Sequence, residues 1–234
     1  MRMIYILLIA ALLALISGCI NPLIPTTTPS PSPIPTKTIE PEVSANLSVG
    51  YLKVFAVVLD GINYTMTETH PSIFVYRFMD GVGNKTIYVD ENSSVLKVVA
   101  QNYTIRYKNP LPTIQYPLIK GQRWYYLSPI TVTYENRSVD GQTTVNGTVE
   151  RFENVTIFNN TTYQTAVVKQ TTVTSYNIDK TNYSVSNEST LWYGQDVGLI
   201  KSYTISKIYV ENSLDQISDR QQEIIEFKQQ DQSQ

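Results

Sequence analysis

Alternating apolar and polar residues fill the chain from about Val43 onward, and this pattern constrains the fold more than any other feature. Successive side chains of a strand point to opposite faces, so a period of two predicts half-buried strands. Clear runs cover residues 72–78, 85–89, 103–107, 130–134 and 163–169. Residues 49–59 and 214–222 are the two stretches where a helical period competes, and we predict that the first of them is a strand.

Short turn signals separate these runs. They are Asp60-Gly61, Asp80-Gly81, Asp90-Glu91-Asn92, Asn109-Pro110 and Asp140-Gly141. Asn146-Gly147 lies too close to Asp140-Gly141 for a second hairpin, so it predicts a glycine bulge. Strands joined by short turns pair antiparallel. The sequence therefore predicts an all-β fold, a single antiparallel curved sheet or half-barrel over residues 46–228, with a polar tail at 229–234.

Two motifs frame the second half of this domain. Pro-Leu-x-x-Gly-x-x-Trp ends at Trp124, and Trp-Tyr-x-x-x-Val-Gly-Leu-Ile-Lys begins at Trp192. Together they resemble the β-rich domains of secreted and lipid-anchored prokaryotic proteins of unknown function, which are similar in outline to the curved sheets of LolA-type lipoprotein carriers. The resemblance implies a fold and an envelope location, but no active site. A turn at 194–198 should bring Trp192 near Leu199 and Ile200, and we predict that Trp124 and Trp192 both anchor the core.

The chain begins with a short apolar segment. Arg2 is the only charge before an unbroken apolar run over residues 4–16, and two small residues then precede Cys19, the only cysteine. This run is shorter than the roughly 20 residues that cross a bilayer, and it has the length and flanks of a signal peptide. Residues 15–19 resemble the lipobox of prokaryotic lipoproteins. That resemblance implies a signal peptide at 1–18 and a diacyl-type lipid on Cys19, with an uncleaved anchor as the alternative.

Residues 19–45 read as a linker rich in Pro, Thr and Ser. Proline recurs at nearly every second or third position between Pro22 and Pro35, which removes backbone donors and favours extended polyproline II geometry. About 20 such residues at ~3.1 Å each would hold a domain roughly 60 Å from a bilayer. We therefore predict a tether that does not join the core.

Acceptor sites for N-glycans are unusually dense. Of sixteen asparagines, twelve open an Asn-x-Ser/Thr triplet without an internal proline. They are Asn46, Asn63, Asn84, Asn92, Asn102, Asn136, Asn146, Asn154, Asn159, Asn160, Asn182 and Asn187. Only 16% of the residues are charged, and bound glycans would keep such a surface soluble. The alternative is that these asparagines are ordinary turn and strand residues. A lipobox together with dense acceptors points to an archaeal cell envelope.

Residues able to carry chemistry are few. His70 is the only histidine and precedes Pro71, so we place it in a surface loop. Without a second histidine or a cysteine outside the lipobox, the chain lacks a His/Cys metal cage and a Cys–His pair. Turn formation accounts for Asp60, Asp80 and Asp140. We expect no enzyme, no catalytic residue, no metal and no cofactor.

Net charge and composition restrict the kinds of partner that the chain could bind. The net charge is −2, without the basic stripe that nucleic-acid binding requires. Tyrosines number 17 against 6 phenylalanines, and tyrosine offers stiff contact area with a polar tip. We expect a non-enzymatic binding or structural module, lipid-anchored in the cell envelope on the outer face of the cytoplasmic membrane, with a protein or glycan partner. The alternative is a LolA-like carrier of a lipid or other hydrophobic ligand; the oligomeric state stays open.

Overall fold

A computed structural model describes residues 42–44, 50–72, 74–80, 83–135, 137–157 and 160–229. The predicted signal peptide, Cys19, most of the linker and the tail beyond Gln229 lie outside the described residues. So do three of the predicted glycan acceptors, Asn46, Asn136 and Asn159. Within the described residues, no helix has the length and hydropathy needed to cross a membrane.

Fourteen strands make up the described fold. The short ones are β1 (Glu42–Val43), β4 (Val75–Asp80), β5 (Asn84–Val89), β6 (Val95–Ala100) and β8 (Leu118–Ile119). The longer ones are β2 (Tyr51–Leu59), β3 (Ile62–Ser72), β7 (Tyr103–Leu111), β9 (Arg123–Tyr134), β10 (Arg137–Thr156), β11 (Thr162–Ile178), β12 (Thr181–Gly194), β13 (Gly198–Val210) and β14 (Ser213–Gln229). The all-β prediction is confirmed, and the two ambiguous stretches belong to β2 and β14.

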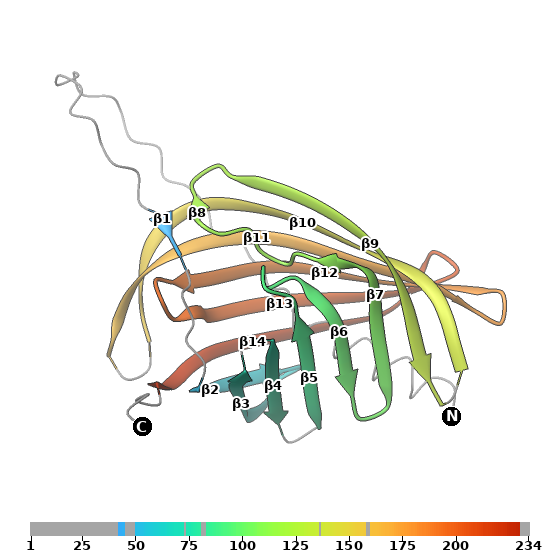
Figure 1. Cartoon of the computed structure of the whole chain (residues 1–234), viewed down its shortest axis with the longest axis horizontal. Coiled ribbons are helices and arrows are strands. Elements are labelled where there is room, and N and C mark those ends of the chain that lie inside the picture. The colour runs from blue at the N-terminus through green and yellow to red at the C-terminus, as the bar shows by residue number, and fades with distance from the viewer. Residues whose placement is uncertain are drawn as a thin grey trace.

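Twelve of these strands close into a barrel (Figure 1), in the order β10-β11-β12-β13-β14-β2-β3-β4-β5-β6-β7-β9. The prediction of an open curved sheet or half-barrel is therefore wrong. Two pairings between strands that are not consecutive complete the ring. Arg220 of β14 lies opposite Leu59 of β2, and Tyr103 of β7 lies opposite Tyr134 of β9. Closure satisfies backbone groups that a sheet edge would leave unpaired.

Two apolar clusters fill the barrel. The larger includes Trp124, Ile130 and Val145, and the smaller includes Phe55 and Ile224. Trp124 is 5% exposed and lies opposite Gly147 on β10. A Cβ atom added at Gly147 would come within 2.2 Å of the indole ring, so this glycine makes room for Trp124. The predicted bulge at Asn146-Gly147 is wrong, and the register shift in β10 lies between Val149 and Arg151 instead.

Strand β1 lies within the range predicted to be linker, yet it belongs to the folded domain. It pairs with β8, and Val43 is buried in the larger apolar cluster. Two further hydrogen bonds fix the next residue: Ser44 N donates to Gln195 Oε1 at 2.9 Å, and Asp196 N donates to Ser44 O at 3.1 Å. Residues 42–44 therefore attach the end of the tether directly to the barrel.

Some of the predicted turns are present in the structure, whereas others lie inside strands. Asp60-Gly61 joins β2 to β3, and Asp90 caps the turn from β5 to β6 by accepting hydrogen bonds from the backbone of Asn92 and Ser94. Asn109-Pro110 lies inside β7 and Asp140-Gly141 lies inside β10, so neither is a turn. A Cβ atom at Gly141 would come within 2.3 Å of the Ser175 carbonyl oxygen. The glycine there permits close packing of strands.

Candidate functional site

An open pocket of about 420 Å³ lies where β10 to β13 extend toward one rim of the barrel. Its lining is mainly polar. It consists of Asp140, Gly141, Gln142, Ser175, Tyr176, Asn177, Asn182, Tyr183, Ser184, Tyr209 and Asn212. The pairing places Gln142, Ser175, Ser184 and Tyr209 in one row across four strands. Tyr176 and Tyr183 of the adjacent row belong to the interior cluster, so the row that ends at Tyr209 faces outward.

Hydrogen bonds preorganise the polar groups of this pocket. Asn177 Nδ2 donates to Asn182 Oδ1 at 2.9 Å, and Ser175 Oγ donates to Ser184 Oγ at 3.2 Å. Asp140 accepts a hydrogen bond from Thr131 Oγ1 at 2.7 Å, and its other oxygen lies 3.1 Å from Lys108 Nζ. The Thr131 hydrogen bond, with Lys108, lowers the pKa of Asp140. The pocket thus presents one carboxylate beside neutral amides and hydroxyls.

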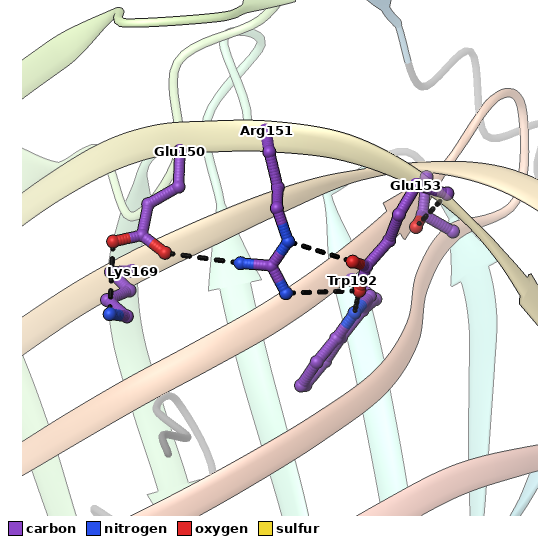
Figure 2. A network of polar contacts seen from close by, with 6 residues as sticks. Glu150, Arg151, Glu153, Lys169 and Trp192 are labelled. Carbon is purple, nitrogen blue, oxygen red and sulfur yellow. Dashed lines mark hydrogen bonds and ion pairs between the residues drawn. The ribbon is translucent and has the colours of Figure 1, made fainter. Parts of the chain in front are cut away.

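Trp192 occupies the outer face of the barrel, half-buried, so the prediction that it anchors the core is wrong (Figure 2). Its Nε1 donates to Glu153 Oε1 at 2.5 Å. Arg151 makes a bidentate pair with the same carboxylate, at 2.8 Å and 3.3 Å. Glu150 links Arg151 to Lys169 through contacts of 3.4 Å and 3.0 Å. This polar network ties β10 to β11 and β12.

Regular alternation along β12 explains why Trp192 faces outward, since the preceding residue, Leu191, belongs to the larger interior cluster. The register shift with β13 places Trp192 opposite Lys201 and Tyr193 opposite Leu199. Burial would raise the pKa of Glu153, but hydrogen bonds from Arg151 and Trp192 outweigh that effect and lower it. Partly exposed ion pairs of this kind contribute roughly 0–1 kcal/mol each. Through this network, Trp192 stabilises the outer surface of the barrel.

A second polar cluster lies inside the barrel. Tyr51 OH donates to Glu68 Oε1 at 2.5 Å, and Lys53 Nζ lies 3.4 Å from the same oxygen. Burial lowers the pKa of Lys53 and raises that of Tyr51. His70 is 3% exposed, and its ring stacks on Tyr76 with centroids 4.3 Å apart. The predicted surface loop at His70 is therefore wrong, because β3 continues through it and turns its ring inward.

Two further buried cations adjoin this cluster. Lys85 Nζ lies 5.1 Å from the centre of the Phe78 ring, and the Arg220 guanidinium carbon lies 5.7 Å from that of Tyr64. Neither side chain forms an ion pair with a carboxylate in the part of the chain that the structure describes. Burial, reinforced by the charge of Arg220, lowers the pKa of Lys85 to about 7. Aromatic faces, together with the more distant Asp80 carboxylate, partly offset these charges.

The low pKa of Lys85 predicts that the protein gains stability as the pH rises from about 7 to about 9. The unfolded chain keeps this proton up to its ordinary pKa of 10.5, whereas the folded chain releases it near 7, so folding is favoured as protons become scarce. Lys85→Met should be more stable than the wild type at pH 7, by a margin that narrows toward pH 9. Urea unfolding at several pH values measures this margin; a constant margin would contradict the assigned pKa.

The described glycan acceptors fall into two groups. Eight are exposed, as a glycan requires: Asn63, Asn84, Asn92, Asn102, Asn146, Asn154, Asn160 and Asn182. Asn187 is 1% exposed, and its Oδ1 accepts a hydrogen bond from Ser206 Oγ at 2.7 Å. Because a bulky sugar cannot occupy this position in the folded barrel, Asn187 is removed from the predicted acceptors. Asn182 lines the outer pocket.

No protein-family model matches the chain, and no curated protein matches its sequence. Among solved structures, the hypothetical lipoprotein YmcC of Escherichia coli K12 is similar, with a TM-score of 0.45 and 11% identity over 80% of this chain and 90% of that one. A provisionally assigned lipoprotein of Parabacteroides distasonis gives 0.43 and 10% identity over 79% and 97%. At this TM-score and identity, neither structure indicates a function for this chain.

Sequence reasoning missed the residues that form the outer pocket. Tyr209 is one of many tyrosines on strands, and Gln142 follows a glycine that resembled a turn residue. Only the register of β10 to β13 brings them into one row. The buried cations were missed for a related reason, because Lys53 and Lys85 alternate with neighbours just as exposed lysines do. Nothing in the sequence marks which face of the strand is interior.

Proposed function

We propose that this protein is a lipid-anchored binding module of the cell envelope, without enzymatic activity, that recognises a glycan in its outer pocket. The observation that supports the proposal is the chemistry of the pocket, which combines amides, hydroxyls and one carboxylate with the ring of Tyr209. Sugar hydroxyls both donate and accept hydrogen bonds, and amide side chains offer both partners. An aromatic ring supplies apolar contact for the sugar face.

The anchor and the tether fit this role. A lipid on Cys19 would hold the chain on the outer face of the cytoplasmic membrane, and the linker would extend the barrel away from it. N-glycans on the exposed acceptors other than Asn182, which lines the pocket, would keep the weakly charged surface soluble. The chain then acts as a surface-held receptor for an envelope polysaccharide.

Replacing Tyr209 with Ala tests the proposal. Loss of the ring should weaken binding of a matching oligosaccharide roughly tenfold, because aromatic contacts contribute about 0.5–1.5 kcal/mol beyond their buried area. Gln142→Ala should weaken it as well, by the loss of one hydrogen bond. Tyr125→Ala is the control, since Tyr125 is 63% exposed and lies outside the pocket. A glycan array followed by calorimetry gives the affinities. Equal loss in Tyr209→Ala and Tyr125→Ala would count against this pocket.

A carrier of a lipid or other hydrophobic ligand would require a different kind of site. A carrier needs an enclosed apolar cavity, whereas the pocket described above is open and largely polar. The buried charges around Glu68 also give the interior a polar part. Native mass spectrometry of the full chain separates the two proposals: a co-bound lipid would favour the carrier, and the same spectra would report glycan mass.

A further inference from the structure

At one rim of the closed barrel, the first residues of β14 project beyond the neighbouring strand β2. Strand β14 pairs with β13 from Ser213 onward, but β2 joins it only from Arg220, so β14 runs on past the end of β2 (Figure 1). Asp60 N donates to Asp219 O at 3.0 Å, and Asp219 N donates to Asp60 Oδ1 at 2.9 Å, which ends the pairing on that side. Among the described strands, none pairs with this side of residues 213–218. We call this segment the β14 edge.

The β14 edge carries two exposed apolar side chains among four polar ones. Leu214 is 56% exposed and Ile217 is 59% exposed, and Ile62, beside the Asp60-Gly61 turn, is 70% exposed. Leu214 lies opposite Tyr209 and Ile217 opposite Lys207. Tyr209 belongs to the outward-facing row, so Leu214 also faces outward. An open strand with exposed apolar residues is a surface on which another strand can add.

Most charges around the β14 edge are negative. Asp60, Asp215 and Glu211 are exposed, and Asp219 is half-buried. The nearest cation on β13, Lys207, is already paired with Glu188 on β12. A strand that adds here therefore meets carboxylates at both ends of the edge. Basic residues on the incoming strand would be attracted, and acidic ones repelled.

We propose that the β14 edge binds an extended segment of a partner protein in which apolar residues alternate with lysine or arginine. Backbone hydrogen bonds to residues 213–218 supply affinity, Leu214 and Ile217 receive the apolar side chains, and the carboxylates select basic ones. A second copy of this chain is a poorer occupant, because its own β14 edge would bring like charges together. The edge adjoins the glycan pocket at Leu214, which lies opposite Tyr209, but Ile217 does not line that pocket.

The test uses the full chain in detergent and a fluorescent peptide of alternating valine and lysine as the probe. Anisotropy measures its affinity, and amide hydrogen exchange reports which strand it covers. We expect slower exchange at residues 213–218, and binding roughly tenfold weaker for the matched peptide of alternating valine and glutamate. Binding should weaken as salt is added, since these charges are exposed. Unchanged exchange along the β14 edge would overturn the proposal.

A pair of variants distinguishes peptide binding at the β14 edge from non-specific electrostatic attraction to the barrel. Ile217→Lys places a cation on the edge and should weaken peptide binding roughly tenfold. Leu127→Lys is the control, because Leu127 is 47% exposed on β9 and lies outside the edge; it should leave binding unchanged. Equal effects of the two variants would overturn the proposal. So would a dimer whose residues 213–218 are protected without peptide, since a second copy would then be the occupant.

Discussion

Trp124→Ala is expected to destabilise the barrel by about 3–5 kcal/mol, the range for removing a large aromatic side chain from a core. The indole packs in the larger apolar cluster, against the space that Gly147 leaves open. Urea unfolding of the purified protein, followed by circular dichroism, measures the loss.

Two matched variants test the assignment of Trp124. Trp124→Phe keeps most of the apolar ring and removes an Nε1 that has no hydrogen-bond partner among the described residues, so it should cost less than Trp124→Ala. Trp192→Ala removes a half-buried ring from the outer face together with its hydrogen bond to Glu153. Its cost should be about 1–2 kcal/mol, because that bond is to a charged but partly exposed group. Equal losses for Trp124→Ala and Trp192→Ala would contradict the placement of these residues on opposite faces.

The two tryptophans show which structural features could be predicted from the sequence and which could not. Each one starts or ends a motif of apolar and aromatic residues, and each lies on a strand, as predicted. Which face of the strand each one occupies depends on which set of alternating residues points into the barrel. Leu191 lies in the interior cluster, so its neighbour Trp192 lies on the outer face. Period-two patterns therefore predict strands well, but not which of the two faces is interior where both carry apolar residues.

Glycine and long-range pairing account for the other differences. Gly141 and Gly147 allow close contact within regular strands, but a glycine beside Asp or Asn looks the same in a turn. Barrel closure depends on Leu59 meeting Arg220, and no local pattern encodes a pairing over that separation. The outer pocket could not be predicted for the same reason, because Gln142 and Tyr209 fall into one row only through four registered strands.

Cys19→Ser is expected to move the protein from the membrane fraction to the soluble fraction. Cys19 is the only residue of the lipobox-like segment that can accept a thioether-linked lipid, and each buried CH₂ of an acyl chain contributes about 0.8 kcal/mol to membrane binding. Two chains anchor stably, whereas none leaves only the barrel and its linker, whose net charge of −2 for the whole chain gives no attraction to an anionic surface. Fractionation of cells followed by immunoblotting reports the location.

The control for this experiment is Ser17→Ala, which keeps a small residue ahead of Cys19 and should stay with the membrane. A second readout is the mass of the N-terminal fragment, which should carry the lipid in the wild type and in Ser17→Ala. If Cys19→Ser remains membrane-bound through an alkaline wash, residues 4–16 act as an uncleaved anchor. The run is shorter than the roughly 20 residues that span a bilayer, so without the lipid it should hold the chain far less firmly than a transmembrane helix would, and release is the expected result.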